Sequence, residues 1–396
     1  MSRSSSIGEL SRLRSMPVER KFYLSDELTR RSLLKLSGMA AIAAAVPRAE
    51  ALPTVTETGS ELIHLNLNEN AYGPSAKILE AIPRELSRIS RYGDPKVAQE
   101  LTEQIAAYEK LPVEQVLLGE ILGVLGPHLG SQGGPGGEFI YSTPGYLALV
   151  DAAAHSGGVE VPVPLDTNYE NDLPALQEAI TSKTRALYLI NPHNPTGTVS
   201  DNETFKKFLR ETSEHAPIIV DEAYLEFTAN FESRSAVSLV RDGANVLVFR
   251  TFDKIHGLAG LPLGYTLAPK KLATDLRSQG VRDAEALGRL NMLAGSIALA
   301  DTAHVQNVRA TVARESAKWF DVLDELKLAH TKSTANFVFF NTNLPQAEIA
   351  EAMRARGILI ARAFPPYATW VRITIGLPKE NHLAQQALRE VFSRKP

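Results

Sequence analysis

Short runs of β-branched and other apolar residues recur along the middle of the chain and alternate with stretches of helical spacing. The helical spacing covers residues 172–180 and 202–213. This alternation is typical of βαβ units, so it predicts an α/β domain built on a mainly parallel sheet. Ligands of such sheets bind at the carboxyl ends of the strands. The expected buried strands are residues 116–118, 139–141, 186–190, 217–220 and 246–249.

The pattern changes after about residue 280. Two long helical patterns, at 284–300 and 303–326, are followed by short apolar runs at 337–340 and 371–375. They predict a second, smaller α+β domain. The glycine-rich segment 130–137 is typical of a turn cluster before a strand, and it lacks the Gly-Lys-Ser/Thr ending of a nucleotide phosphate loop.

The composition is that of an ordinary globular chain and excludes several classes of partner. The 396 residues are 44% hydrophobic and 22% charged, a length that allows roughly two or three domains. With 42 basic and 45 acidic residues, the net charge is −3, so nucleic acid is not an expected partner. The chain has no cysteine, and its nine histidines lack paired metal-site spacing. We therefore expect neither disulfides nor a metal site.

The amino-terminal residues carry the pattern of an export signal. Arg30 and Arg31 precede an apolar run at 36–46, and residues 49–51 (Ala-Glu-Ala) have the form of a signal-peptidase site. The run is about half of a bilayer span; a soluble helix at 40–45 is the alternative. The block resembles a twin-arginine signal. We therefore expect cleavage near Ala51, the twin-arginine translocase as a partner and a periplasmic mature protein.

Four polar segments lie at the predicted strands, at residues 191–197, 221–224, 251–265 and 371–376. Each has a structural explanation by itself. The sequence Asn-Pro-Thr-Gly at 194–197 favours a turn, and an aspartate such as Asp221 can cap a helix. Lys254 and Arg372 fit solvated surface positions. The joint order and spacing of the four segments are not explained in this way.

That order resembles the fold-type I pyridoxal phosphate enzymes, and among them the histidinol-phosphate aminotransferase branch. The resemblance extends from about residue 62 to the end and includes three further blocks, at 65–75, 91–95 and 143–146. It implies a homodimeric aminotransferase that uses pyridoxal 5'-phosphate to move an amino group between an amino acid and a 2-oxo acid. After the signal peptide at 1–51, it implies an N-terminal arm at 52–85, a large cofactor-binding domain at 86–280 and a small domain at 281–396.

The resemblance assigns catalytic roles to Lys254, Asp221 and Tyr224. Lys254 matches the lysine that links covalently to the cofactor aldehyde and later moves the proton. Asp221 matches the carboxylate opposite the pyridine nitrogen, whose charge favours the protonated, electron-withdrawing ring. Tyr224 and Asn194 match the hydrogen-bond partners of the ring's 3′-oxygen, and Tyr146 matches the aromatic residue stacked on the ring.

Substrate binding is assigned to a second group of side chains. Arg372 matches the arginine that holds the substrate α-carboxylate, a role that suits a planar bidentate donor. Arg362 matches a second substrate-facing arginine. The resemblance also places Asn194 and Tyr72 at the substrate.

The cofactor phosphate is the part of the site where this chain departs from the family pattern. Thr251 matches its surroundings, and Tyr92 matches a residue that reaches the phosphate across the dimer interface. Gly119 and Glu120 occupy phosphate-binding positions of the family, but a small polar residue is usual there. Family members usually have serine before the lysine and arginine eight residues after it, whereas this chain has Asp253 and Pro262. We expect phosphate binding to be weakened but not abolished.

Two other functions stay open. A lyase or decarboxylase would use the same Lys254 and Asp221, because the bond that breaks depends on its angle to the ring. An exported binding protein would keep the fold without catalysis. Histidinol phosphate fits poorly with export, so the amino donor also stays open. His256 is expected to pack in its loop, and Trp319 and Trp370 to fill the core or the substrate pocket.

Overall fold

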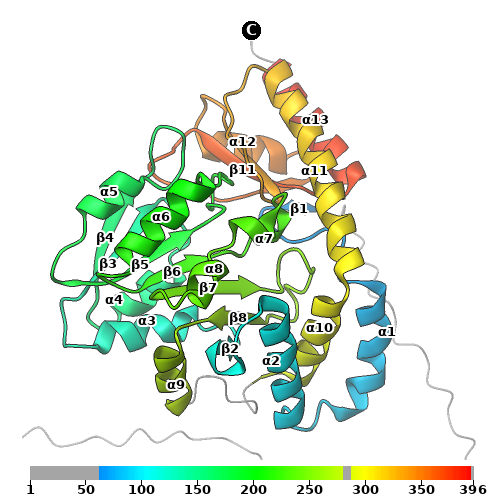
Figure 1. Ribbon diagram of the computed structural model, residues 1–396. Coiled ribbons are helices and arrows are strands. Elements are labelled where there is room, and N and C mark those ends of the chain that lie inside the picture. Colours follow the sequence, from blue (N-terminus) through cyan, green and yellow to red (C-terminus); the bar gives the residue numbers. More distant parts are fainter. Residues whose placement is uncertain (1–61, 280–286, 394–396) are drawn as a thin grey trace, which may run out of the picture. The chain divides into compact units, whose positions relative to one another are not determined.

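The computed structural model describes residues 62–279 and 287–393 (Figure 1). The predicted signal peptide and its cleavage site lie outside the described residues. The described residues belong to one compact unit. Within these two ranges, no helix has the length and apolar character needed to cross a membrane.

The centre of the described unit is a seven-stranded sheet with the order β2-β8-β7-β6-β5-β3-β4. Only β8 is antiparallel to its neighbours, so the prediction of a mainly parallel α/β sheet is confirmed. The strands are β2 (Val116–Leu118), β3 (Glu138–Thr143), β4 (Val159–Pro164), β5 (Thr184–Ile190), β6 (Ile218–Asp221), β7 (Val246–Thr251) and β8 (Gly264–Leu267).

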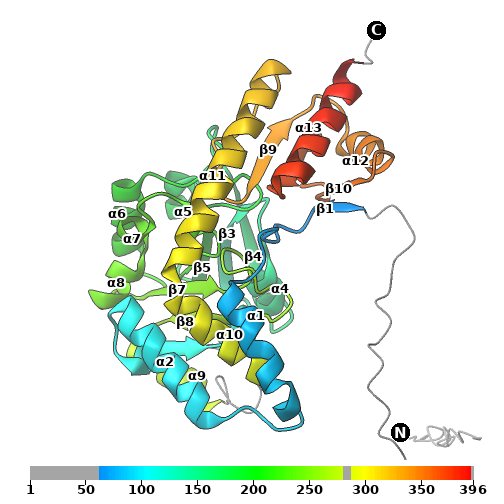
Figure 2. The same ribbon diagram turned by 90° about the vertical axis from the view of Figure 1, so that its right-hand side faces the viewer.

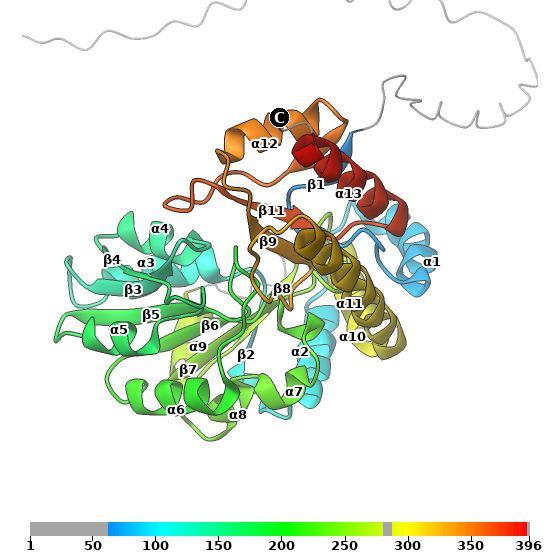
Figure 3. The same ribbon diagram turned by 90° about the horizontal axis from the view of Figure 1, so that it is seen from above.

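Helices cover both faces of this sheet, as Figure 3 shows from above. Along β5, Tyr188 packs toward one face, whereas Leu187 and Leu189 pack toward the other, because successive strand side chains alternate. The first face is covered by α3 (Leu122–Ser131), α4 (Ala148–Ala154) and α9 (Lys270–Ser278). The second carries α2 (Pro95–Glu109), α5 (Leu173–Glu178), α6 (Asn202–Thr212), α8 (Val237–Arg241) and α10 (Arg289–Ala300).

Several of these helices begin at side-chain caps that the sequence supplies. Asp94, Asp172 and Asp201 accept hydrogen bonds from backbone N–H groups in the first turns of α2, α5 and α6. Capping carboxylates satisfy free N–H groups and oppose the positive end of the helix dipole. Caps of this kind fix where the helices start relative to the strands that precede them.

A second core lies around a small antiparallel pair of strands, as predicted. The elements of this part are β9 (Phe337–Asn341), β11 (Trp370–Thr374), α11 (Thr302–Glu325), α12 (Gln346–Arg354) and α13 (Pro378–Ser393). Figure 2 shows α11 and α13 side by side. In addition, β1 (Ile63–Leu65) pairs in parallel with β10 (Ile358–Ile360). The amino-terminal strand is therefore joined to the carboxy-terminal part of the chain.

Two strands of the large sheet were not predicted. Strand β4 has the sequence Val-Glu-Val-Pro-Val-Pro and lies at the edge of the sheet, where proline is tolerated because it need not donate to a neighbour. Strand β8 has only four residues and begins at Gly264. Short strands with glycine or proline give a weak sequence pattern.

The packing of α10 bears on where the large and small domains meet, although the predicted limits remain predictions. Met292, Ala294 and Ala298 of α10 belong to the core on the second face of the sheet. Helix α10 also contacts α2 and α1 (Ala76–Glu85), which leads into a 3-10 turn at Leu86–Arg88. This packing favours a limit near Asp301, between α10 and α11, over one at residue 281.

Candidate active site

The carboxyl ends of three adjacent strands bring most of the predicted residues to one cavity. Strand register places Ile190 of β5 beside Asp221 of β6, and Asp221 beside Phe249 of β7. The cavity has a volume of about 280 Å³. Nine predicted residues line it: Glu120, Tyr146, Asn194, Asp221, Tyr224, Thr251, Lys254, Arg362 and Arg372.

Asp221 is a buried carboxylate at the end of β6. The Tyr188 hydroxyl donates to its Oδ2 at 2.7 Å, and the Ala223 N–H donates to its Oδ1 at 3.0 Å. Burial raises the pKa of Asp221 above its usual value, while these two donors and the charge of Lys254 oppose the rise. A buried carboxylate held in this way favours a cationic partner in the cavity.

Lys254 is held in a loop that the amino-terminal arm fixes in place. The Asn70 side chain donates to the carbonyl of Ile255 at 2.8 Å. Gly257 has a φ of +70°, and a Cβ there would lie 2.4 Å from the backbone of Gly73. Only glycine allows this close approach between the two segments. The arm therefore contributes to the position of the lysine.

Arg372 reaches the cavity from β11. Its Nη1 donates to Asn194 Oδ1 at 2.5 Å, and its Nη2 donates to the carbonyl of Asn66 at 3.1 Å. Burial lowers the pKa of Arg372 to about 10, so the guanidinium remains charged at neutral pH. Its planar cation can hold a carboxylate through two hydrogen bonds.

Three predicted site residues do not line the cavity of their own chain. Gly119 precedes Glu120 and has a φ of +120°, and its N–H donates to the carbonyl of Gly264. The Tyr72 hydroxyl donates to the carbonyl of Gly376 at 3.3 Å. Tyr92 is 81% exposed and lies in a separate depression with Leu261 and Arg289. The roles of Tyr72 and Tyr92 stay predictions.

Several cavity or support residues were not predicted, among them Asn68 and Tyr188. Asn68 donates to the Tyr224 hydroxyl at 3.1 Å and lines the cavity together with Leu67 and Phe364. Tyr188 holds Asp221 from inside a strand. The position of Tyr188 within an apolar run predicts only that its side chain is buried. Asn68 has a φ of 58°, which asparagine tolerates better than most residues, but its sequence gives no sign of that conformation.

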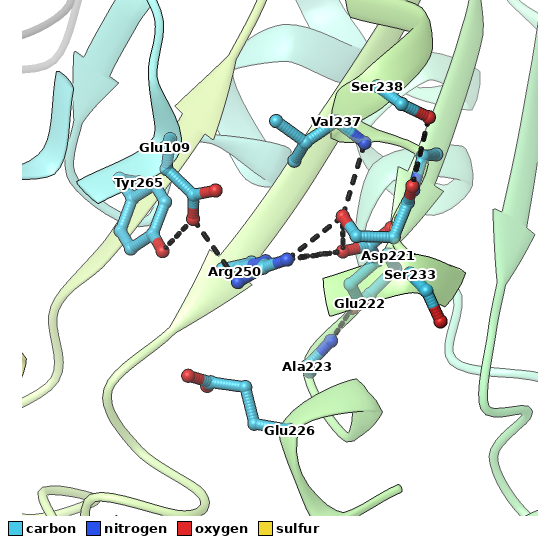
Figure 4. A network of polar contacts seen from close by, with 12 residues as sticks. Glu109, Asp221, Glu222, Ala223, Glu226, Ser233, Val237, Ser238, Arg250 and Tyr265 are labelled. Atoms are coloured by element: carbon cyan, nitrogen blue, oxygen red, sulfur yellow. Dashed lines mark hydrogen bonds and ion pairs between the residues drawn. The ribbon is translucent and has the colours of Figure 1, made fainter. Parts of the chain in front are cut away.

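A buried ion-pair network around Arg250 lies close to Asp221 (Figure 4). Arg250 precedes Thr251 on β7 and therefore points away from it. It forms ion pairs with Glu222 at 3.0 Å and with Glu109 at 3.1 Å. Tyr265 donates to Glu109 at 2.7 Å. The network joins α2, β6, β7 and β8 next to Asp221 and Thr251.

The ring-facing side of the cavity fits pyridoxal 5'-phosphate. Lys254 supplies an amine, Asp221 a buried carboxylate that suits a protonated ring nitrogen, and Asn194 and Tyr224 suit the ring oxygen. The bound cofactor supplies the electron-withdrawing ring that aminotransfer needs. Within the described ranges, no group of histidine, aspartate and glutamate side chains could hold a metal ion.

The sheet and the cavity together define a fold-type I pyridoxal phosphate enzyme. The sequence pattern described as aminotransferase class I and II matches residues 60–387, so the chain belongs to this family of aminotransferases.

Similar proteins agree with this assignment. The chain is 32% identical over 338 residues to a histidinol-phosphate aminotransferase of Symbiobacterium thermophilum, covering 83% of this chain and 90% of the relative. It is 32% identical over 340 residues to an aromatic amino acid aminotransferase of Cutibacterium acnes, covering 84% and 93%. The chain also superposes on the crystal structure of histidinol-phosphate aminotransferase from Sinorhizobium meliloti in complex with pyridoxal-5'-phosphate, with a TM-score of 0.75 and 27% identity. The superposition covers 84% of this chain and 92% of that structure.

Proposed function

We propose that this chain is an exported aminotransferase in which Arg372 binds the α-carboxylate of the amino acid and Lys254 moves the proton. One observation carries this proposal: Arg372 donates to Asn194, and both side chains line the same cavity as Lys254 and Asp221. A substrate carboxylate held at Arg372 would thus lie in the same cavity as the amine that acts on it.

The remaining side chains would orient the reaction. Asp221 would hold the proton of the ring nitrogen, with Tyr188 and the Ala223 N–H keeping the carboxylate in position. Tyr224, held by Asn68, would donate to the ring oxygen. Tyr146 would cover one face of the ring. Each of these roles needs a fixed side chain, and the hydrogen bonds to Asp221 and Tyr224 supply that constraint.

Arg362 supports a dicarboxylic acceptor such as 2-oxoglutarate. It is exposed and lines the cavity, and both it and Arg372 contact the Phe364 ring. The guanidinium carbons are 4.7 and 4.9 Å from the ring centroid. The two cations could therefore hold the two carboxylates of one substrate. The named relatives act on histidinol phosphate or aromatic amino acids, which makes ring-bearing amino donors the first class to test.

A homodimer and export complete the proposal. Leu79, Leu86, Ile89 and Tyr92 are large, exposed side chains on α1 and the segment that follows. Exposed apolar groups of this kind favour association with a second copy.

The pattern of Arg30, Arg31 and the apolar run at 36–46 supports export before cleavage near Ala51.

The direct test is a screen of amino acids against pyruvate and 2-oxoglutarate with the mature protein. We expect a new amino acid and a new 2-oxo acid in equal amounts. Release of carbon dioxide or ammonia without an acceptor would favour a decarboxylase or lyase. Borohydride reduction should label Lys254, and Lys254→Ala should lose both the label and turnover. Label on another lysine would contradict the site assignment.

A further inference from the structure

The cavity end where the cofactor phosphate should lie carries two acidic side chains. Glu120 stands at the start of α3, and the Thr251 hydroxyl donates to its Oε1 at 3.0 Å. A Cβ on Gly264 would lie 2.5 Å from the same oxygen. The Glu120 carboxylate therefore lies over the ends of β7 and β8. It occupies a place near a helix amino terminus, where an anion is favoured.

Asp253 adds a second carboxylate to the same end of the cavity. Its Oδ1 is buried and has no hydrogen-bond partner. The Asp253 N–H donates to Thr251 Oγ1 at 3.1 Å. The Thr251 hydroxyl thus accepts one hydrogen bond, and its proton faces Glu120 Oε1 at 3.0 Å, closer than the carbonyl of Leu263 at 3.5 Å. It has no proton left for a phosphate oxygen while Glu120 stays in place.

The positive charge at this end is small. Lys254 is the cation whose charge opposes the rise in pKa of the Glu120 and Asp253 carboxyl groups. Pro262 follows the lysine by eight residues and is exposed, and its carbonyl accepts from Asn291 Nδ2 at 2.9 Å. No basic side chain from that position reaches the cavity.

We infer that this cavity end discriminates weakly between phosphorylated and phosphate-free forms of the cofactor, because the Glu120 carboxylate takes the place and the Thr251 proton that a phosphate would use. The chain then binds pyridoxal and pyridoxamine through its ring contacts at affinities within about 100-fold of those of the phosphate esters. A dianion gains contacts with backbone N–H groups of α3 but meets two carboxylates. This inference rests on Lys254 and Asp221 being the ring-binding residues proposed above.

The test compares pyridoxamine with pyridoxamine phosphate on the cofactor-free mature protein by calorimetry at about pH 8, above the Glu120 pKa of about 7, so that the carboxylate is charged. We expect the parent chain to favour the phosphate ester by less than about 100-fold, and Glu120→Gln to raise this preference at least about 10-fold. Asp253→Asn is the second variant and should act in the same direction. Glu114→Gln makes the same carboxylate-to-amide change at an exposed position outside the cavity and should leave the preference unchanged.

Borohydride reduction with each aldehyde, followed by mass spectrometry, separates this inference from the proposed function. Pyridoxal and pyridoxal 5'-phosphate should both label Lys254. The inference is overturned if the parent chain prefers pyridoxamine phosphate to pyridoxamine by more than about 100-fold. It is also overturned if neither Glu120→Gln nor Asp253→Asn, when folded, raises this preference. Either result leaves the proposed function intact. Failure of both aldehydes to label Lys254 overturns the function and the inference together.

Discussion

Arg372 Nη1 donates to Asn194 Oδ1 across a sequence separation of 178 residues. The bond joins strand β11 of the small sheet to the loop after β5 of the large sheet. An arginine suits this position because its planar group can bond Asn194 through one nitrogen and still present other donors to the cavity. Under the proposed function, this bond would couple substrate binding at Arg372 to ring binding at Asn194.

Replacing Arg372 by lysine should weaken amino acid binding. A lysine keeps the charge but cannot make the bidentate contact, so we expect kcat/KM to fall by roughly 10- to 100-fold. Steady-state kinetics with the best donor measures this change. The control is Arg362→Lys at the exposed side of the cavity, which should affect the dicarboxylic acceptor more than the donor. Equal losses for donor and acceptor in both variants would contradict the assigned roles.

The cavity could be anticipated from the sequence to the extent that it depends on strand ends. The parallel strands that end at Ile190, Asp221 and Thr251 have strong apolar patterns, and the polar residues after them converge because parallel strands end at one edge. Contacts that depend on backbone conformation or on distant segments could not be anticipated. Asn68 is an example, because its contact with Tyr224 spans 156 residues.

The acidic character of the phosphate end of the cavity could be predicted only in part from the sequence. Asp253 and Pro262 departed from the family pattern, which predicts weaker phosphate binding. That Thr251 donates to Glu120 depends on side-chain packing between β7 and α3, and no spacing rule gives it. Strands β4 and β8 were missed for a related reason, since their pairing comes from the sheet and not from their own residues.

The buried network behind the site should dominate the stability of the large domain. Arg250→Met would leave Glu109 and Glu222 buried without their cation, and we expect a loss of about 3–5 kcal/mol in the free energy of unfolding. Urea denaturation measures it. The control is Arg210→Met, which removes an exposed ion pair with Asp242 and should cost under about 1 kcal/mol. Similar losses in the two variants would refute a special role for the network.

Glu120 should make the cofactor-free protein less stable as the pH rises. Desolvation in the cavity, followed by the charge of Asp253, raises the pKa of Glu120 to about 7, while Thr251 and Lys254 oppose the rise and Asp221 adds to it. A raised pKa means that the folded state binds the proton more tightly than the unfolded state. The stabilisation is present below about pH 4.5 and is lost as the pH rises through 7.

Solvent reaches Glu120 through the cavity, so screening reduces the effect to about 1 kcal/mol. Urea midpoints measured between pH 5 and pH 8 should therefore fall more steeply for the parent chain than for Glu120→Gln. Glu114→Gln again serves as the control and should follow the parent chain. Parallel pH profiles for the parent and Glu120→Gln would show that Glu120 titrates normally.

Export should depend on the arginine pair at residues 30 and 31. Replacing both by lysine keeps the charge but removes the twin-arginine pattern, so the protein should stay in the cytoplasm. Cell fractionation with an activity assay measures the distribution. Arg48→Lys is the matched change outside the pair and should leave export unaltered. Equal periplasmic recovery of the double variant would refute the twin-arginine interpretation.

Because the chain has no cysteine, introduced cysteines can test whether Tyr92 reaches the cofactor site of a second copy of the chain. Tyr92 lies outside the cavity of its own chain and is largely exposed, while Asp253 lies at the phosphate end of the cavity. If Tyr92 reaches the partner's cofactor site, a Tyr92→Cys chain and an Asp253→Cys chain should be joined by a short bismaleimide. Chains with tags of different size identify the mixed product on a denaturing gel. A Glu348→Cys chain, with its cysteine on α12, replaces Asp253→Cys in the control and should give little product. Equal yields of cross-linked product from the two mixtures would place Tyr92 away from the partner's site. A much higher yield with Asp253→Cys than with Glu348→Cys would show that each cavity is completed by a second copy of the chain.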